Sequence, residues 1–252
     1  MRHRGADTSR TNDRVAEELP VALVFNGISH AVMMVTPREL QPFAMGFALT
    51  EGLVAQASDI FDIEVHDHGR SFEAQITIAS QEFVQLKQQR RSMAGRSGCG
   101  VCGIESIELL DLKPARIDAA PLHDATRLQP AIARASSELS RHQELMRSTG
   151  GVHAAAWCDA SGAVLRVCED VGRHNALDKL IGHLALEGVD MRAGFVFMSS
   201  RASYELVRKA ARMNIPMLAT ISAPSTLAID IAIEAGVKLV SFCRQDGCVE
   251  YT

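Results

Sequence analysis

The spacing of hydrophobic positions predicts a chain in which strands alternate with helices. Residues 20–35 have the pattern of a β-hairpin with Asn26-Gly27 at its turn, because Asn-Gly suits the positive φ angles of a two-residue type I′ turn. Apolar and polar residues alternate over 72–79, and with 61–66 this segment predicts a second pair of strands. The first third of the chain is therefore expected to contain four strands.

The residues after the first strand pair predict the start of a helix. Thr36 is expected to be the N-cap, Pro37 fits the first helical position, and Glu39 completes a capping box. This helix should run to about Leu53. A more polar helix is expected over 81–91.

The second half of the chain shows a regular alternation of elements. A helix over 129–147 and a hairpin over 153–168 are expected first. The elements expected after them are helix 173–187, strand 194–199, helix 203–213, strand 216–221, helix 225–235 and strand 237–242. Strands that alternate with helices of this length predict a mixed α/β sheet with helices on its faces.

Composition places a domain boundary near residue 120, because residues 114–126 are irregular and contain two prolines. Residues 1–18 are polar and are expected to form a disordered tail. Residues 19–120 are predicted to form an α+β domain that carries a cysteine loop over 92–104. Residues 121–252 are predicted to form the larger domain.

Length and charge exclude several classes of protein. The chain has 252 residues, 47% of them hydrophobic, and a formal net charge of −4, so it can bury a full core and gives no general attraction for nucleic acid or membrane. It lacks an apolar run of roughly 20 residues and the apolar core of a secretory signal. Six cysteines without such a signal predict reduced thiols and a cytoplasmic location.

The segment Gly-Cys-Gly-Val-Cys-Gly over 98–103 carries the most informative chemistry. Its thiols, Cys99 and Cys102, stand among three glycines, which let the backbone turn freely and let other molecules approach closely. Four interpretations remain open from the spacing: half of a structural zinc site completed by Cys243 and Cys248, a redox pair, a sulfur carrier that holds a persulfide, or an inert turn.

Two polar segments follow predicted strands in the second half. Asp170 and Arg173 lie where a strand gives way to a helix, and Ser199, Ser200 and Arg201 follow another strand. Backbone N–H groups and arginine at such positions suit an anionic ligand. For the first segment, the alternative is that Asn175 and Asp170 merely cap the turn; for the second, it is that the serines simply cap the next helix. Both interpretations remain open.

Three further side chains are expected to pack in the core. His153 alternates with apolar neighbours on its strand, and Cys158 and Cys168 could face one another across the hairpin as buried thiols.

Six separated segments together resemble the FdhD/NarQ family of formate dehydrogenase accessory sulfurtransferases. They are residues 98–103, 149–156, 169–179, 199–205, 221–225 and the C-terminal 242–244 with 251–252. They occur in the expected order, and the resemblance covers nearly everything from about residue 20 to the end.

The resemblance implies a fold and an activity. The larger domain is expected to have a cytidine deaminase-like fold, without deaminase activity, beside a smaller α+β N-terminal domain. Members take sulfur from a cysteine desulfurase and deliver it to the bis(molybdopterin guanine dinucleotide) form of the molybdenum cofactor, before that cofactor enters formate dehydrogenase. Position by position, Cys99 would hold the persulfide and Cys102 would be the second thiol.

The resemblance also assigns a cofactor-binding segment after the last long strand. Its residues are Phe242, Cys243, Arg244, Gln245, Asp246 and Gly247. Within it, Arg244 could hold phosphate and Asp246 could accept the N–H donors of guanine, so a guanine nucleotide should mimic the cofactor.

The sequence therefore predicts a cytoplasmic sulfurtransferase with no resident metal, for which the molybdenum cofactor is a bound substrate. Its expected partners are a cysteine desulfurase, the formate dehydrogenase apoenzyme and a second copy of itself; nucleic acid and membrane are not expected. The alternatives are a non-catalytic carrier of the cofactor, which needs no thiol, and a zinc-binding structural protein.

Overall fold

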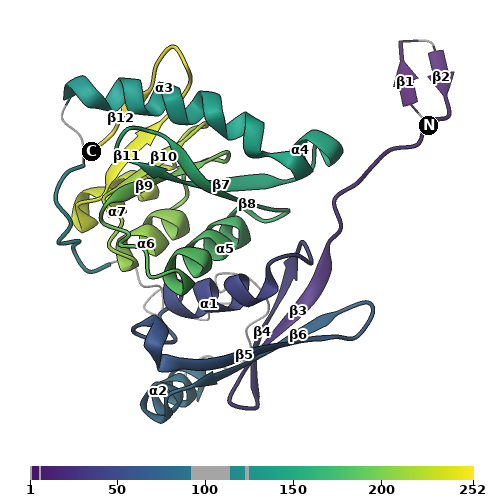
Figure 1. Cartoon of the computed structure of the whole chain (residues 1–252), viewed down its shortest axis with the longest axis vertical. Coiled ribbons are helices and arrows are strands. Elements are labelled where there is room, and N and C mark those ends of the chain that lie inside the picture. Colours follow the sequence, from purple (N-terminus) through teal and green to yellow (C-terminus); the bar gives the residue numbers. More distant parts are fainter. Residues whose placement is uncertain (1, 6, 92–113, 123–124) are drawn as a thin grey trace.

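Two β-sheets lie on either side of a central pair of helices in the computed structural model of this chain (Figure 1). The structure describes residues 2–5, 7–91, 114–122 and 125–252. The central helices are α1 (Leu40–Thr50) and α5 (Arg173–Leu186). The predicted mixed α/β class is confirmed. No helix in the described part of the chain has the length and apolar character that a membrane crossing requires.

The smaller sheet has four strands in the order β4-β3-β6-β5. Its strands are β3 (Leu19–Phe25), β4 (Ile28–Val35), β5 (Ile60–Asp67) and β6 (Phe72–Ile78). Both predicted strand pairs are confirmed, and φ angles of 45° at Asn26 and 81° at Gly27 form the predicted hairpin turn. Helix α2 (Ser80–Arg91) follows. Ahead of the sheet, a two-stranded hairpin in the segment expected to be a disordered tail stands away from the body of the molecule in Figure 1: β1 (Arg2–Arg4) and β2 (Asp7–Ser9).

The larger sheet has six strands in the order β12-β11-β10-β9-β7-β8. They are β7 (His153–Asp159), β8 (Val164–Asp170), β9 (Gly194–Met198), β10 (Met217–Thr220), β11 (Lys238–Ser241) and β12 (Val249–Glu250). β9, β10 and β11 are parallel, whereas β7 is antiparallel to β9. The carboxyl ends of the three parallel strands therefore meet at one edge of the sheet.

Helices cover both faces of the larger sheet because its inner strands β7, β9, β10 and β11 are buried on both sides. Helix α3 (Ala125–His142) covers one face, where it packs against Phe195 and Phe197. Helices α5, α6 (Tyr204–Arg212) and α7 (Thr226–Ala235) cover the other, where Val196 and Met198 point. That second core cluster continues into the smaller sheet, so the two predicted domains share one hydrophobic core.

The prediction of one continuous helix over 129–147 is wrong, because the helix is interrupted at Gln143. α3 ends at His142, and a separate helix α4 (Glu144–Thr149) follows. Glu169 of β8 accepts hydrogen bonds from the backbone N–H groups of Leu145 and Met146, at 2.7 and 2.8 Å. A carboxylate at this position satisfies donors that a helix start leaves free. A partner distant in sequence therefore fixes the break.

The predicted capping box at the start of α1 is also wrong. α1 begins at Leu40, after Glu39 with a left-handed φ of 55°. Thr36 is turned toward the β8–α5 connection: its N–H donates to Asp170 Oδ2 at 3.0 Å, and its hydroxyl accepts from Val171 N at 3.2 Å. Thr36 therefore joins the two sheets and does not cap the helix.

The segment predicted to be the domain junction lies along the larger unit. Ile117 N donates to Ala235 O of α7 at 2.8 Å, and Asp118 N donates to the Asn214 side chain at 3.0 Å.

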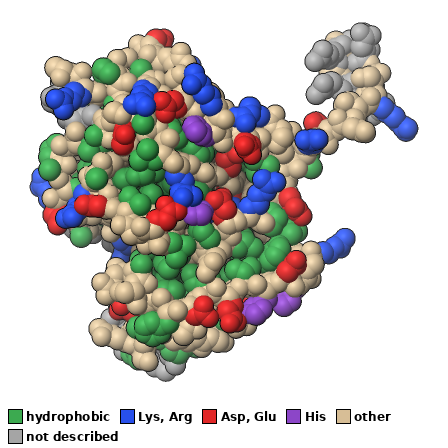
Figure 2. Space-filling model, viewed as in Figure 1, with side chains coloured by type: hydrophobic (Ala, Val, Ile, Leu, Met, Phe, Trp, Pro, Cys, Tyr) green, Lys and Arg blue, Asp and Glu red, His purple; other side chains and the backbone are tan. Residues whose placement is uncertain are grey.

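Helices α1 and α5 cross with their backbones in contact because each has a glycine at the crossing. A Cβ on Gly46 would lie 1.8 Å from Asp178 O, and one on Gly182 would lie 1.8 Å from Pro42 O. α1 is apolar on nearly all sides, as a helix enclosed in a protein interior must be. Hydrophobic side chains gather over its position between the two sheets in Figure 2.

A buried charge network fixes one end of the crossing. Lys209 Nζ lies 2.8 Å from Asp178 Oδ1, from Thr50 Oγ1 and from Glu51 Oε1. Burial opposes ionisation of Glu51, but the charges of Lys209 and Arg208 outweigh it and lower the pKa of Glu51 from 4.5 to about 2.

We expect Gly182→Ala to destabilise the protein strongly. The added methyl group would meet the backbone of Pro42 at 1.8 Å, and neither helix can move without disturbing the shared core. The free energy of unfolding in urea should fall by about 3 kcal/mol or more, at the upper end of overpacking effects. Gly247→Ala is the control, because among the described residues no heavy atom, apart from its own chain neighbours, lies within 4 Å of the position its added methyl group would take. Equal stability of the two variants would contradict the close crossing.

Glu51→Gln should destabilise the protein in a pH-dependent way. A carboxyl group with a lowered pKa in the folded state stabilises that state above the pKa of the unfolded chain. The stability difference between wild type and variant should be largest above pH ~5 and disappear as the pH falls through 4.5 toward about 2. Urea denaturation over this range measures it. The exposed Glu64→Gln is the control, and a difference for Glu51→Gln that does not change with pH would contradict the assigned pKa.

Candidate functional site

Three connections meet at the carboxyl ends of the parallel strands β9, β10 and β11. Ser222 N donates to Ser200 O at 3.4 Å, and Phe242 N donates to Ser222 O at 3.4 Å. These bonds place three of the segments singled out in the sequence side by side: 199–201, 221–225 and 242–247. Ligands of α/β proteins commonly bind at this edge of the sheet.

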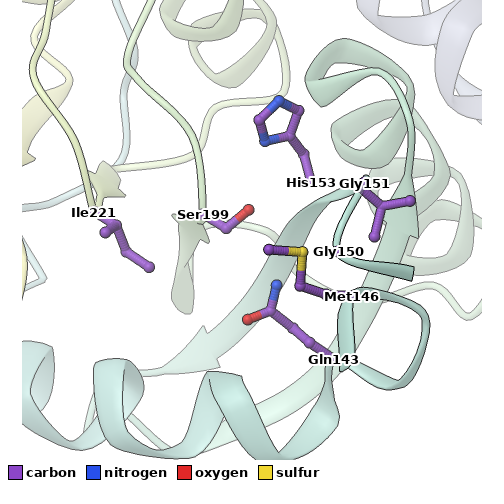
Figure 3. Close-up of a pocket in the computed structure, with 8 residues that line it drawn as sticks. Gln143, Met146, Gly150, Gly151, His153, Ser199 and Ile221 are labelled. Carbon is purple, nitrogen blue, oxygen red and sulfur yellow. The ribbon is translucent and has the colours of Figure 1, made fainter. Parts of the chain in front are cut away.

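A pocket of about 470 Å³ opens at the same edge (Figure 3). It is lined by Gln143, Met146, Gly150, Gly151, Val152, His153, Ser199 and Ile221. The α3–α4 break and the loop after α4 form one side, and the ends of β9 and β10 form the other. The lining combines apolar side chains with the polar groups of Gln143, His153 and Ser199, which could orient a small ligand.

The sequence does not predict the pocket residues from α4 and the α3–α4 break. The single continuous helix expected there would place Gln143 and Met146 on a solvated helix. Gly150-Gly151, in one of the segments that carry the family resemblance, is the available signal.

His153 lines this pocket, so the expectation that it packs in the core is wrong. It is half-buried at the start of β7. Burial lowers the pKa of its imidazole, and the positive charges of Arg173 and His174 lower it further. The imidazole is therefore neutral near pH 7, and it can both donate and accept a hydrogen bond.

The two side chains singled out in the turn before α5 have different roles: one is held by hydrogen bonds within the fold, and the other keeps a polar atom that a ligand could bind. Asp170 is fully buried; its Oδ1 accepts from Gly172 N and Asn175 Nδ2, and its Oδ2 lies 2.7 Å from Lys179 Nζ. The interpretation that Asp170 caps the turn therefore holds. Arg173 differs, because its Nε is buried without a hydrogen-bond partner among the described residues.

Among the three residues after β9, the serines have structural roles. Ser199 lines the pocket, and its Oγ accepts a hydrogen bond from Ala154 N at 2.8 Å. Ser200 is buried. Arg201 is exposed.

Segment 242–247 forms a tight turn with mostly exposed side chains. Arg244 N donates to Gly247 O at 2.8 Å, and Phe242 has a left-handed φ of 54°. Arg244, Gln245 and Asp246 are exposed, as a binding role requires. Cys243 is the exception among the six predicted residues, since its side chain is completely buried.

All four cysteines in the described part of the chain are free, and all four thiols have raised pKa values. Burial is the main cause for each; it raises the pKa of Cys243 to about 12 and those of Cys158, Cys168 and Cys248 above their ordinary value. Such thiols carry almost no thiolate at neutral pH and are poor nucleophiles. Cys158 and Cys168 are buried, as expected, but they do not face one another, because Cys158 pairs with Val164, Cys168 pairs with Ala155, and the two belong to different core clusters. Cys99 and Cys102 lie outside the described residues.

The chain is similar to known proteins over its whole length. Residues 16–252 match the model of the FdhD/NarQ family. A protein of Burkholderia mallei named "Sulfur carrier protein FdhD" is 62% identical over 257 residues, which cover 100% of this chain and 93% of that protein. Proteins with the same name from Chromobacterium violaceum and Acinetobacter baylyi are 61% and 49% identical, over 100% of this chain and 93% and 90% of theirs.

A solved structure has the same fold. It is a putative formate dehydrogenase accessory protein from Desulfotalea psychrophila, with a TM-score of 0.72 and 22% identity, over 99% of this chain and 93% of that one. With the family model matching nearly every residue and relatives above 60% identity, this chain belongs to the FdhD/NarQ family.

Proposed function

We propose that this chain is a cytoplasmic sulfur carrier for formate dehydrogenase. It accepts sulfur from a cysteine desulfurase as a persulfide on Cys99 and delivers it to the bis(molybdopterin guanine dinucleotide) cofactor before the cofactor enters the apoenzyme. The observation that carries the proposal is the full-length similarity to proteins named sulfur carrier protein FdhD, in a chain with the Gly-Cys-Gly-Val-Cys-Gly segment.

The state of the other thiols supports the assignment to Cys99. A persulfide forms when a thiolate attacks the outer sulfur of the desulfurase persulfide; a new S–S bond forms, and the desulfurase cysteine leaves as thiolate. The four described cysteines have raised thiol pKa values and are poorly suited to this attack. Cys99 and Cys102 remain as the sulfur-carrying pair.

Cys102 completes the transfer in this proposal. Its thiolate attacks the Sγ of Cys99, which forms a Cys99–Cys102 disulfide and expels the terminal sulfur as hydrosulfide for the molybdenum centre. A cellular dithiol then reduces the disulfide and restores both thiols. This sequence balances without any oxidant, because the persulfide itself is the oxidised partner.

The edge of the larger sheet is the proposed cofactor site. Arg244 is exposed where it can bind phosphate, and the exposed Asp246 carboxylate can accept the N–H donors of guanine. Arg173 lies at the start of α5, where a helix N-terminus favours anions. The neutral His153 lines the pocket at this edge. We also propose that two copies of the chain act together as a homodimer.

Cys99→Ala should leave the protein folded but unable to accept sulfur. After incubation with a cysteine desulfurase and cysteine, mass spectrometry should find one added sulfur atom on the wild type and none on the variant. Cyanide-labile sulfur should likewise be present on the wild type and absent from the variant. Cys248→Ala is the matched control, because that thiol is partly exposed and should not matter. A Cys99→Ala variant that still supports full formate dehydrogenase activity would refute the sulfur-transfer mechanism and leave a cofactor carrier without a reactive thiol.

Asp246→Ala should weaken guanine nucleotide binding selectively. The carboxylate would accept two hydrogen bonds from guanine that adenine cannot donate, so the affinity for GDP should fall by about 10–100-fold while the weaker affinity for ADP changes little. Isothermal titration calorimetry measures both. Glu234→Ala, which removes an exposed carboxylate on α7 outside this segment, is the control. Equal losses for both nucleotides would contradict the assigned role of Asp246.

A further inference from the structure

Glu39, Cys168 and His183 bring three metal-ligating atoms together beside the crossing of α1 and α5. His183 Nε2 lies 2.7 Å from Glu39 Oε1, and Cys168 Sγ lies 3.9 Å from the same oxygen. All three atoms lie within 4.8 Å of one another. None of the three residues belongs to the cysteine pair or to the sheet edge proposed for cofactor binding.

The three side chains come from elements far apart in the sequence. Glu39 immediately precedes α1, Cys168 lies in β8, and His183 lies in the last turn of α5. Cys168 is buried, whereas the His183 and Glu39 side chains are 20% and 36% exposed. The cluster therefore has an apolar inner side and an opening to solvent.

This donor set suits zinc. Thiolate, imidazole and carboxylate are the three protein ligands that zinc uses, commonly with water as a fourth. Tetrahedral zinc places such atoms about 3.3–3.6 Å apart, because its bonds are about 2.0–2.3 Å long. The observed separations of 2.7 and 3.9 Å lie on either side of that range, so side-chain shifts of less than 1 Å would bring these two pairs to it.

The surrounding charges also permit a cation. The two positive groups whose charges act on the Cys168 thiol, Arg166 and Lys179, are each paired with a carboxylate, that of Glu187 and that of Asp170. A zinc ion with one thiolate, one carboxylate and a neutral imidazole has no net charge, which suits a partly buried position.

We propose that Glu39, Cys168 and His183 form a zinc-binding site that ties the start of α1 to β8 and α5. Zinc binds a cysteine as the thiolate, so binding releases the thiol proton and zinc affinity should rise with pH. The site would reinforce the junction between the two sheets, a role separate from sulfur transfer.

Cobalt(II) titration tests the proposal through the coordinating sulfur. The full-length protein carries Cys99→Ala and Cys102→Ala, which removes the proposed sulfur-carrying thiols as a source of the same signal. One equivalent of Co²⁺ should produce a thiolate-to-cobalt charge-transfer band that Zn²⁺ then abolishes. Cys168→Ser should remove the band. Cys158→Ser, which changes another buried thiol in the same hairpin, should keep it.

His183→Gln provides a second test should Cys168→Ser fail to fold. Loss of a hydrogen-bonded neighbour of a metal ligand typically weakens binding by 10–100-fold, so loss of a ligand should weaken Zn²⁺ binding by at least ~100-fold. His174→Gln, in the first turn of the same helix, is the control.

Thermal unfolding gives an independent readout. Zinc at 100 times its dissociation constant should raise the Tm of the Cys99→Ala/Cys102→Ala protein by about 5–10 °C, and His183→Gln should abolish the rise. Absence of the charge-transfer band, or equal metal affinity in the parent and in both ligand variants, would overturn the proposal. Neither result would bear on sulfur transfer, because the reactive thiols are absent from the protein tested.

Discussion

The fold depends on the close crossing of α1 and α5. Gly46 and Gly182 remove the two Cβ atoms that would hold the helices apart, so one helix backbone rests on the other. Buried polar networks lie at both ends of the contact: Lys209 with Asp178 and Thr50, and Lys179 with Asp170 and Thr36. Buried charges are tolerated only when each finds its partner, so these networks allow one register of the two helices. The crossing thereby joins the two sheets into one molecule with a shared hydrophobic core.

This constraint reaches the proposed cofactor site through the β8–α5 turn. Asp170 accepts the N–H of Thr36 from the smaller sheet and the N–H of Gly172 within the turn. The next residue, Arg173, begins α5, close enough to His153 for its charge to lower the pKa of that imidazole. The smaller sheet thus helps to position a charged group at the pocket, although it contributes none of the lining residues. A substitution at Thr36 would act on the pocket through this chain of contacts.

The sequence predicted what short-range chemistry determines. The Asn26-Gly27 turn, the alternation of strands and helices and the position of residues 199–201 and 242–247 directly after strands were all found in the structure. The features that the sequence-based predictions got wrong depend on contacts with residues distant in sequence. Thr36 looked like a helix cap because its partner, Asp170, is 134 residues away, and the α3–α4 break depends on Glu169. His153 shares its strand with buried alanines, so only the position of α4 reveals that it faces a pocket.

A sulfur carrier must also prevent sulfur from reaching the wrong thiol. Burial provides that selectivity here without any specific recognition, because a protonated thiol in an apolar setting does not attack a persulfide. Cys243 illustrates the point: it lies within the segment assigned to the cofactor, yet its side chain points into the core and donates to Val240 O. Its exposed neighbours Arg244 and Asp246 can contact a dinucleotide while the thiol stays inert. The same burial that stabilises the larger sheet therefore keeps the described thiols out of the sulfur chemistry proposed for the glycine-rich segment.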